Sequence, residues 1–586
     1  MAKIIYIVPD LKKFVPFDPK ETEHARVDLS KFNADIFNIS SDEKDRLDNE
    51  YLDFLAGLAQ RDRSVFWWAN AVSERNELLS RFYTRLLTLH CLKRYITDNR
   101  LTNVVIVCPD ALLVGPLIDQ FRPEFKVVWE AARWTVYRWR VYNGLRFFVK
   151  LGFLLIDKIS RMLISRIYLK RKFLNRRITA AHAIKVWVDH RSYAKGEYND
   201  AYFTRLIDYL KESQAEHILL ADVIQDYHQN IRRIAQDGHN TILPLEYFFS
   251  LGDLFQAVIS SFKHRPHVRE ALTFGHVDAS SLVRNELEES FSGTRFLQNI
   301  FYYYQIKSLA KNVPLKSFTY TFENYAWEKM CLLALKESDR GIKCIGFQHA
   351  FIAKNSFKYF LGKEEAAIVP KPDRIVTMGK VTERILRQYG HWPQEILKTG
   401  CALRQIQTAQ PVTVKYGECR DLLVPFTMTA DESVRILNFL YEAGLGEYPG
   451  KVILRFHPQT PVKKVFKQLP FTLPENFIIS EGQPLKEDLA RAGLVLCTWT
   501  TVGLEALMAG LPVIYLDVNR PLDLDPLFEW THLKERAGLP EELKGKIERL
   551  LNLDQEDYRS SLEKSRQYLK EYFYPITEQS LKQFVH

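Results

Sequence analysis

The sequence LVLCTWTTVGLEALMAGLPVIYLD, residues Leu494–Asp517, decides the fold of this chain. It contains, in order, an apolar run typical of a strand, a turn rich in hydroxyl groups, a helix-forming run, a glycine stop and a second apolar run. In an open parallel sheet, ligands bind beyond the carboxyl ends of strands, where helix N-termini present unpaired N–H groups. The turn therefore predicts a binding site for a phosphate group.

A second strand end of this kind lies about forty residues earlier. The segment VILRFHPQ (Val452–Gln459) is an apolar, β-branched run that stops at Arg455, His457 and Pro458. A lone histidine at a strand end is more often structural, but the two segments together predict one phosphate site. An imidazolium at His457 would donate a charge-assisted hydrogen bond to the phosphate. The residues expected to bind there are Arg455, His457, Pro458, Thr498, Thr500, Thr501 and Glu505.

Short apolar runs alternate with helix-forming stretches along most of the chain. The runs are Ile4–Val8, Ser64–Trp68, Val104–Cys108, Lys126–Trp129, Lys185–Asp189, Ile218–Ile224, Lys316–Tyr320 and Lys343–Phe347, followed by a second alternation from Asp421. Strands that alternate with helices predict an α/β fold with doubly wound parallel sheets.

With 586 residues the chain is too long for a single core, so two or three domains are expected. We expect an N-terminal α/β region at 1–130, a basic amphipathic segment at 131–182, a Rossmann-like domain at 183–385, a second one at 386–560, and a C-terminal helix at 561–586. The sequence leaves open whether residues 1–130 form a separate domain or add strands to the first large sheet.

The positive charge of the chain is concentrated in one segment. Between Ala131 and Ala180 there are thirteen Lys or Arg and one acidic residue, Asp157, against a net charge of +10 for the whole chain. The part Gly144–Lys172 predicts a helix with two sides. Its polar stripe is Arg146, Lys150, Asp157, Arg161, Ser165 and Lys172; its apolar side is Phe148, Leu151, Leu155, Ile159, Met162, Leu163 and Ile167; four aromatic residues, Trp134, Tyr137, Trp139 and Tyr142, precede it.

A wide apolar side, an aromatic flank and basic residues predict a helix that lies in the interface of an anionic membrane. A core helix with a solvated basic face is the alternative. Nucleic-acid binding is disfavoured, because aromatic residues in an apolar helix suit lipid better than base stacking. The expected membrane contacts are Arg146, Lys150, Arg161, Arg166, Lys170, Arg171 and Lys172.

Seven cysteines are scattered singly, without metal-ligand spacing, which favours reduced thiols and a cytoplasmic protein. The N-terminal MAKIIYIVPDLKKF lacks the layout of a signal peptide, and no run approaches the roughly 18 apolar residues of a spanning helix. We therefore expect a cytoplasmic protein, peripheral on the inner face of the cytoplasmic membrane.

The expected pair of facing Rossmann-like domains resembles the architecture of GT-B glycosyltransferases, and VGLEALMAGLPVIYLD resembles their donor-binding stretch. The strand-end His457–Pro458 followed by the Ser/Thr-type turn resembles enzymes that use CMP-activated acidic sugars, namely sialyltransferases and capsule Kdo transferases. It also resembles CDP-glycerol glycerophosphotransferases. The resemblance implies a glycosyltransferase of lipopolysaccharide or capsule polysaccharide biosynthesis that moves a sugar from a nucleotide donor to a glycan or lipid-linked acceptor.

Two segments of the first half, YTFENYAWEKM (Tyr320–Met330) and CIGFQHAF (Cys344–Phe351), resemble bacterial surface-carbohydrate biosynthesis proteins. Each ends a predicted strand with polar residues, as does VWVDHRSY (Val186–Tyr193). We expect Glu323, His349 and Asp189 at the cleft, as a general base or as ligands of the acceptor or the leaving phosphate. A helix-capping glutamate and a structural histidine are the alternatives for the first two.

No metal and no cofactor are expected. The pair Asp523 and Asp525 forms a DxD sequence, but it lies in a probable loop and such a pair occurs by chance in a chain of this length. P-loop, GxGxxG and HExxH sequences are absent. Two other functions stay open: a CDP-glycerol-type glycerophosphotransferase, and a non-catalytic scaffold docked on a membrane.

Overall fold

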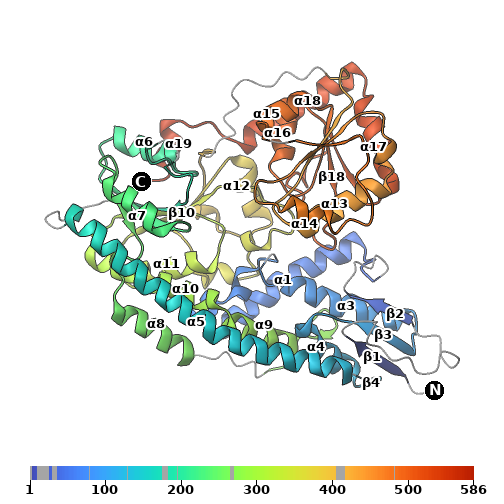
Figure 1. Ribbon diagram of the computed structural model, residues 1–586, viewed down its shortest axis with the longest axis horizontal. Coiled ribbons are helices and arrows are strands. Elements are labelled where there is room, and N and C mark those ends of the chain that lie inside the picture. The colour runs from blue at the N-terminus through green and yellow to red at the C-terminus, as the bar shows by residue number, and fades with distance from the viewer. Residues whose placement is uncertain are drawn as a thin grey trace.

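The computed structural model describes residues 3–8, 25–29, 36–77, 79–128, 130–173, 182–193, 196–263, 270–338, 340–403, 416–480 and 482–585, without the side chains of 130–133, 135, 171 and 173. In this part of the chain three parallel sheets follow one another, and a long helix crosses the lower front of the molecule (Figure 1). The α/β class and the two large Rossmann-like sheets predicted from the sequence are confirmed.

The N-terminal sheet has four parallel strands and is separate from the first large sheet. In the described part of the chain, the strands of residues 1–130 therefore do not extend the first large sheet. Its strands, in spatial order, are β2 (Ala25–Asp28), β3 (Asn103–Val107), β1 (Ile4–Val8) and β4 (Lys126–Val128). Its helices are α1 (Ser41–Arg61), α2 (Val65–Ala69), η2 (Ala71–Glu74), α3 (Phe82–Asp98) and α4 (Ala111–Phe121).

One strand predicted in this region is wrong. The run Ser64–Trp68 forms the short helix α2, because the Ser64 hydroxyl accepts a hydrogen bond from the Trp67 amide and caps a helical turn. Trp67 and Trp68 are both buried there. An apolar run of five residues does not distinguish a buried strand from a buried helical turn.

The middle sheet has seven parallel strands, ordered β13-β12-β11-β10-β5-β6-β7. They are β5 (His182–Val188), β6 (His217–Val223), β7 (Ile242–Pro244), β10 (Ser317–Thr321), β11 (Lys343–Gln348), β12 (Arg374–Thr377) and β13 (Leu397–Thr399). The strand order runs outward in both directions from the neighbours β5 and β10, which makes the gap between them the topological switch point. Strand β13 extends this sheet past residue 385, where the sequence suggested the domain would end.

Helices cover the middle sheet. They are α6 (Thr204–Glu212), α7 (Tyr227–Gln236), α8 (Leu251–Lys263), α9 (Ser280–Ser292), α10 (Thr294–Asn312), α11 (Ala326–Lys336), η3 (Phe357–Tyr359), η4 (Glu365–Ala367), α12 (Lys380–Gln388) and η5 (Gln394–Ile396), with the hairpin β8 (Thr273–Phe274) and β9 (Val277–Asp278). The N-terminal and middle regions share one hydrophobic core. For example, the rings of Tyr51 and Tyr83 lie 5.2 and 4.8 Å from that of Phe357.

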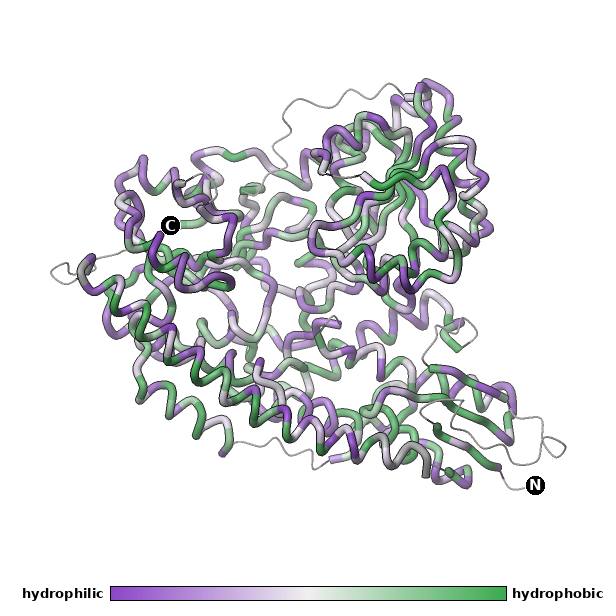
Figure 2. The backbone as a smooth tube through the Cα atoms, viewed as in Figure 1, coloured by the Kyte–Doolittle hydropathy of each residue, from purple (hydrophilic) through white to green (hydrophobic). Residues whose placement is uncertain are grey.

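The C-terminal sheet has six parallel strands in the order β16-β15-β14-β17-β18-β19, with the switch point between β14 and β17. They are β14 (Leu422–Pro425), β15 (Val452–Arg455), β16 (Phe477–Ile479), β17 (Leu494–Cys497), β18 (Val513–Leu516) and β19 (Lys534–Ala537). The central strands are strongly hydrophobic (Figure 2), whereas β19 has the polar sequence KERA, which explains why no apolar pattern predicted it.

The helices of this part are α13 (Ala430–Glu442), η6 (Leu445–Glu447), α14 (Val462–Phe466), α15 (Leu485–Ala490), α16 (Val502–Ala509), α17 (Pro540–Leu551), α18 (Gln555–Tyr572) and α19 (Glu578–Lys582). Helix α18 contacts both α16 and α12 and so packs across the domain boundary. Beyond it the chain returns to the middle domain, where Tyr574 N donates to Met378 O at 2.9 Å.

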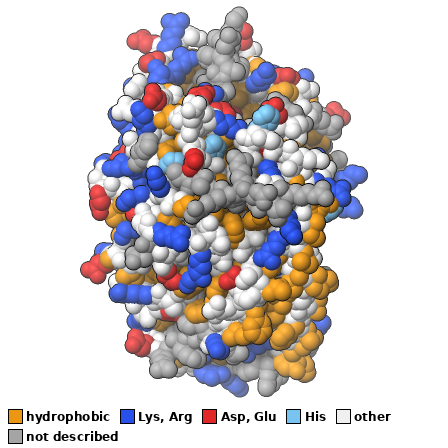
Figure 3. All heavy atoms as spheres, turned by 90° about the vertical axis from the view of Figure 1, so that its left-hand side faces the viewer, with side chains coloured by type: hydrophobic (Ala, Val, Ile, Leu, Met, Phe, Trp, Pro, Cys, Tyr) orange, Lys and Arg blue, Asp and Glu red, His pale blue; other side chains and the backbone are white. Residues whose placement is uncertain are grey.

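The basic segment forms one helix of 44 residues, α5 (Glu130–Phe173). It runs diagonally across the molecule from β4 of the N-terminal sheet to the middle domain (Figure 1). In the part of the chain that the structure describes, no helix combines the length and the apolar composition needed to cross a membrane. Figure 3 shows hydrophobic side chains gathered at its lower right, the side on which α5 and α8 lie.

Candidate active site

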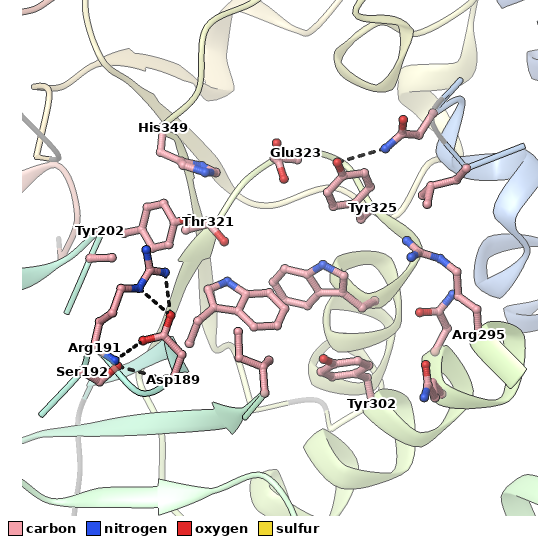
Figure 4. A pocket seen from close by; sticks show the side chains of 18 of the residues that line it. Asp189, Arg191, Ser192, Tyr202, Arg295, Tyr302, Thr321, Glu323, Tyr325 and His349 are labelled. Carbon is pink, nitrogen blue, oxygen red and sulfur yellow. Dashed lines mark hydrogen bonds and ion pairs between the residues drawn. The ribbon is translucent and has the colours of Figure 1, made fainter. Parts of the chain in front are cut away.

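A cavity of about 690 Å³ opens at the switch point of the middle sheet. Asp189 follows β5 and Glu323 follows β10, the two strands that flank this point, and His349 follows β11 beside them. All three residues predicted from separate segments of the sequence line this cavity (Figure 4). The carboxyl ends of parallel strands meet at one edge of a sheet, which is why strand-end residues far apart in sequence converge.

The cavity has an aromatic floor above a buried lysine. The rings of Trp187 and Trp327 stand nearly perpendicular, with centroids 5.7 Å apart. Beneath them the Lys185 ammonium lies 4.2 Å from the Trp327 ring centroid and 3.5 Å from an Asp222 carboxylate oxygen. Burial lowers the pKa of Lys185 to about 8, although Asp222 opposes the shift. An apolar aromatic face beside polar side chains suits the apolar and hydroxylated faces of a sugar.

Glu323 is the carboxylate best placed to take a proton from a substrate. Its side chain is 22% exposed, and it forms an ion pair with Lys358, which also donates to Tyr325 Oη at 3.2 Å. Burial pushes the pKa of Glu323 upward, but Lys358 and His349 outweigh burial and hold it below the usual value. Glu323 is therefore ionised at neutral pH.

The loop that carries Glu323 is held rigidly. Buried Glu328, in the first turn of α11, accepts hydrogen bonds from Glu323 N at 3.0 Å and Asn324 N at 2.8 Å. Asn324 has a positive φ of 60° and donates through its side chain to Lys358 O. Burial and the charge of Glu323 raise the pKa of Glu328. Glu328 therefore orients the loop that carries Glu323, a role that the sequence did not indicate.

Asp189 is bound to its own loop. It accepts hydrogen bonds from Arg191 N at 2.8 Å and from Arg191 Nη2 at 2.6 Å. Burial tends to raise the pKa of Asp189, but its hydrogen bonds with Arg191 lower it overall. Both carboxylate oxygens of Asp189 accept from Arg191, so Asp189 holds Arg191 in place, and the Arg191 side chain is 71% exposed. His349, by contrast, stacks edge-on against Tyr202 with ring centroids 4.7 Å apart.

The N-terminal region supplies one wall of the cavity. Asn76 lines the cavity and donates to Tyr325 Oη at 3.0 Å. Buried Glu74 accepts from the amide of Ala326, at the start of α11, and from Arg295, another cavity residue. No strand end or motif pointed to Asn76 or Arg295, because both reach the site only through contacts between regions distant in the sequence.

The turn predicted to bind phosphate follows β17, as expected, and β17 flanks the switch point of the C-terminal sheet. The hydroxyl of Thr500 accepts from Val502 N at 3.3 Å at the start of α16, and Thr501 is the N-cap residue of that helix. The Thr501 hydroxyl lies 3.4 Å from Glu505. Thr498 is fully buried, and its hydroxyl has no hydrogen-bond partner among the described residues.

Arg455 is engaged within its own domain. Its Nη1 donates to Asp488 at 2.6 Å and to Gln483 O at 2.8 Å. Burial favours a higher pKa for Asp488, but hydrogen bonds from Ser480, Arg455 and Arg491 hold it below its usual value. These contacts give Arg455 a structural role at the end of β15.

His457 and Pro458 lie at the surface beyond β15, with His457 partly buried. Burial lowers the pKa of His457, and the positive charge of Arg191 lowers it further. Arg191 belongs to the middle domain, so the two strand ends lie close enough for their charges to interact. The expectation that His457 acts as an imidazolium is not favoured, since both effects stabilise the neutral ring, which can still donate one N–H.

A second cavity, of about 440 Å³, lies between the C-terminal domain, the middle domain and the N-terminal region. Its lining includes Trp499, from the predicted phosphate turn, and Lys358, and it shares Asn76 with the larger cavity. The ion pair of Glu323 with Lys358 therefore stands between the two cavities.

One carboxylate joins three strand ends beside this second cavity. Buried Glu432, in the first turn of α13, accepts hydrogen bonds from Thr427, from Trp499 Nε1 at 2.8 Å and from Asn519 Nδ2 at 2.8 Å. These partners follow β14, β17 and β18 respectively. Its position in the first turn of a helix was the only sequence signal for Glu432, and it did not reveal the network.

Both carboxylates of the DxD sequence form ion pairs within the protein. Asp523 pairs with Arg536 at 2.6 Å, and Asp525, buried, pairs with Lys534. Within the described residues, no group of three or more His, Cys, Asp or Glu could hold a metal ion. All seven cysteines are free thiols.

The basic residues predicted to contact a membrane divide into two sets. Arg161, Arg166 and Lys172 donate to backbone carbonyls of the middle domain, at Val223, Phe249 and Asp237 respectively. Ser165, which belongs to the same predicted polar stripe, is buried. Arg146, Lys150 and Lys170 are exposed, and the side chain of Arg171 lies outside the described residues.

No protein-family profile matches the chain, and no curated protein matches it. Solved structures similar to it include a glycosyltransferase from Rickettsia africae ESF-5, at 12% identity over 70% of this chain and 96% of that chain, with a TM-score of 0.39. UDP-GlcNAc 2-epimerase from Neisseria meningitidis bound to UDP-GlcNAc is 9% identical over 65% of this chain and 94% of that chain, with a TM-score of 0.38. MurG of Acinetobacter baumannii is 11% identical over 69% and 99%, with a TM-score of 0.37.

Proposed function

We propose that the protein is a metal-independent glycosyltransferase that moves a sugar from a nucleotide donor to a hydroxyl group of a glycan or lipid-linked acceptor. The observation that carries this proposal is the position of the Glu323–Lys358 pair between two cavities. The larger cavity belongs to the middle domain and suits a sugar acceptor, and the smaller one adjoins the hydroxyl-rich turn of the C-terminal domain.

In the proposed reaction, the acceptor hydroxyl attacks the anomeric carbon of the donor sugar and its proton passes to the Glu323 carboxylate. The bond between the anomeric carbon and the phosphate oxygen breaks, and the nucleotide phosphate leaves with that electron pair. The ionised state of Glu323 supports this role. Asp189 positions Arg191, and His349 binds acceptor or leaving phosphate at the same edge.

The donor phosphate is proposed to bind at the N-terminus of α16, against Thr500 and Thr501, with the fully buried Thr498 supporting the turn. Free N–H groups, hydroxyl groups and the helix dipole stabilise developing negative charge there without a metal. His457 and Pro458 would cover this phosphate from the end of β15. Arg455 and Glu505 would act by positioning that strand end and the helix, as their contacts suggest.

For the donor we propose a CMP-activated acidic sugar, of the Kdo or sialic type. Arg191 and Arg295 line the larger cavity and keep exposed side chains beside their partners Asp189 and Glu74, so the carboxylate of a donor sugar that extends into this cavity would meet two cations. A CDP-glycerol donor would use the same histidine and hydroxyl turn but would leave a polyol phosphate in the product. We further propose that transfer takes place at the inner face of the cytoplasmic membrane, in lipopolysaccharide or capsule assembly.

The test is a thermal-shift screen of the purified chain against CMP, CDP, UDP, GDP and ADP. A ligand that binds only the folded state stabilises it by about 2.7 kcal/mol at a hundredfold excess over its Kd. We expect a selective shift with CMP or CDP that His457→Ala and Thr500→Ala both diminish. The matched control is His239→Ala, at an exposed loop of the middle domain outside both cavities.

A selective thermal shift with UDP or GDP would agree with the proposed glycosyltransferase activity and contradict the proposed cytidine donor. No shift with any nucleotide, or full turnover in both variants, would overturn the proposed function. Product analysis for phosphorus then separates sugar transfer from glycerol phosphate transfer.

A further inference from the structure

The outer face of α5 is a continuous apolar stripe. Its exposed large hydrophobic residues recur every three or four positions over most of the helix, as one face of a helix requires. They are Trp134, Tyr137, Val141, Tyr142, Leu145, Phe148, Val149, Phe153, Ile156, Leu163 and Ile167, with exposed fractions from 45% to 70%. The predicted apolar side is therefore divided: Met162 is buried and Leu151, Leu155 and Ile159 pack against the core, whereas Phe148, Leu163 and Ile167 face outward. Arg161 and Lys172 of the polar stripe bind the protein.

Helix α8 presents a second exposed apolar stripe beside the first. Leu251, Phe255 and Phe262 are 60%, 68% and 49% exposed and occupy positions i, i+4 and i+11 of one helix face. The Phe262 ring lies 6.1 Å from the ring of Phe147 on α5. At the other end, Arg166 of α5 donates to the carbonyl of Phe249, just before α8 begins. The two helices therefore run antiparallel, and their apolar stripes belong to one surface.

The charges around this surface exclude a second copy of the chain as its partner. Exposed Arg138, Arg140, Arg146, Lys150 and Lys170 border the stripe of α5, and Lys263 ends α8. The one acidic residue of α5 beyond its first position, Asp157, is bound to Arg161. Two copies packed face to face would bring like charges together, at a cost in free energy. An anionic lipid surface accepts both the apolar stripe and the basic border.

We infer that α5 and α8 together form a monotopic face that lies in the headgroup region of an anionic phospholipid bilayer, with the side chains of α8 inserting beside those of α5. The role of this face, which is to bring the acceptor cavity to a lipid-linked substrate, rests on the proposed function.

The membrane face and the acceptor cavity share one helix. Helix α10 supports α8 through hydrogen bonds from Ser308 Oγ to Asp253 at 2.9 Å and between Tyr304 Oη and Ser260 Oγ at 3.3 Å. The N-terminal half of α10 lines the acceptor cavity with Arg295 and Tyr302. Helix α10 therefore both contacts α8 and lines the acceptor cavity, which connects the membrane face to the cavity through one helix.

The experiment is co-sedimentation of the full-length protein with vesicles of phosphatidylglycerol and phosphatidylcholine, compared with vesicles of phosphatidylcholine alone. We expect the double variant Leu251→Ser/Phe255→Ser to bind the anionic vesicles about 10-fold more weakly or worse, because two inserted apolar side chains are lost. The control double variant Ile478→Ser/Leu539→Ser, also at exposed apolar positions but on the C-terminal domain, should bind like the parent.

The inference would be overturned if the parent protein did not co-sediment with the anionic vesicles. It would also be overturned if the α8 variant bound them as strongly as the parent does. A third contradicting result would be a parent that sediments as a dimer without lipid while the α8 variant sediments as a monomer. Each variant is also screened for its nucleotide thermal shift. If the parent binds the vesicles but shows no nucleotide thermal shift, only the proposed function is contradicted. If the parent shows the thermal shift but does not bind the vesicles, only the membrane face is contradicted.

Discussion

The middle and C-terminal sheets use the same strand order around their switch points, yet they equip the two edges in opposite ways. At the middle edge, carboxylates, cations and tryptophans surround a cavity of about 690 Å³, and Glu323 retains a partly exposed carboxylate. At the C-terminal edge the nearby charges are paired within the domain, as with Arg455 and Asp488, and the turn before α16 is built from hydroxyl and backbone groups.

This difference fits a division of labour in group transfer. Moving a proton from an acceptor hydroxyl requires an ionisable group with a controlled pKa, and such a group must keep some exposure to its substrate. Stabilising a leaving phosphate requires fixed dipoles, and charged residues serve there mainly to hold the strand ends in place. Glu432, which joins the ends of β14, β17 and β18, performs that second task.

The largest expected effect comes from removing the carboxylate at the middle edge. Glu323→Gln should lower kcat about 10²- to 10⁴-fold, the usual contribution of a general base, with little change in the nucleotide thermal shift. The control is Glu337→Gln, which alters a carboxylate that also pairs with a lysine, Lys307, but lies outside both cavities. Near-normal turnover in Glu323→Gln would remove the assignment of Glu323 as the base and place proton transfer elsewhere at this edge.

A structural charge at the C-terminal edge should behave differently. Arg455→Ala leaves the buried Asp488 with Ser480 and Arg491, and should destabilise the protein by about 1–3 kcal/mol, the cost of removing one partner of a buried polar group. Thermal denaturation measures this loss, and the nucleotide Kd of the remaining folded protein tells the two roles apart. An unchanged melting temperature with a large loss of affinity would show that Arg455 binds the donor directly.

A hydroxyl group at the phosphate turn should have an intermediate effect. Thr500→Ala removes the hydroxyl that accepts from Val502 N, and should weaken nucleotide binding about 10-fold, or about 1.4 kcal/mol, while Thr500→Ser should retain affinity. Isothermal titration with the nucleotide selected by the screen measures both. Equal affinities in the alanine and serine variants would contradict a hydroxyl contact.

The smallest effect is a dependence of stability on pH. Because the pKa of Asp488 is lower in the folded than in the unfolded protein, the folded state gains stability that is fully present above the ordinary aspartate pKa of about 4 and is lost as the pH falls through the folded value. Urea denaturation of the parent and of Asp488→Asn, at several pH values, should show a difference that shrinks as the solution becomes more acidic. A difference that grows on acidification would reverse the sign of the argument.

Several features could be predicted because they depend on neighbouring residues. The alternation of apolar runs predicted the parallel sheets, although Ser64–Trp68 became a helix and the polar strand β19 was missed. Polar residues directly after strands predicted Asp189, Glu323 and His349 as members of one site. That prediction needed only the rule that parallel strands end at a common edge.

What the tertiary structure decided is which groups are paired and which way each face turns. The sequence contains Arg455, Glu432 and Lys358, but their partners come from other segments, so only the fold separates structural from available charges. The same holds for Asn76 and Arg295, which the N-terminal region and α10 bring to the cavity. For α5 the sequence determined that the helix has an apolar and a basic side, and packing determined which apolar residues are buried, such as Met162, and which face out, such as Phe148 and Leu163. Local pattern follows from the order of the residues, whereas pairing and orientation depend on contacts between segments that the chain order does not specify.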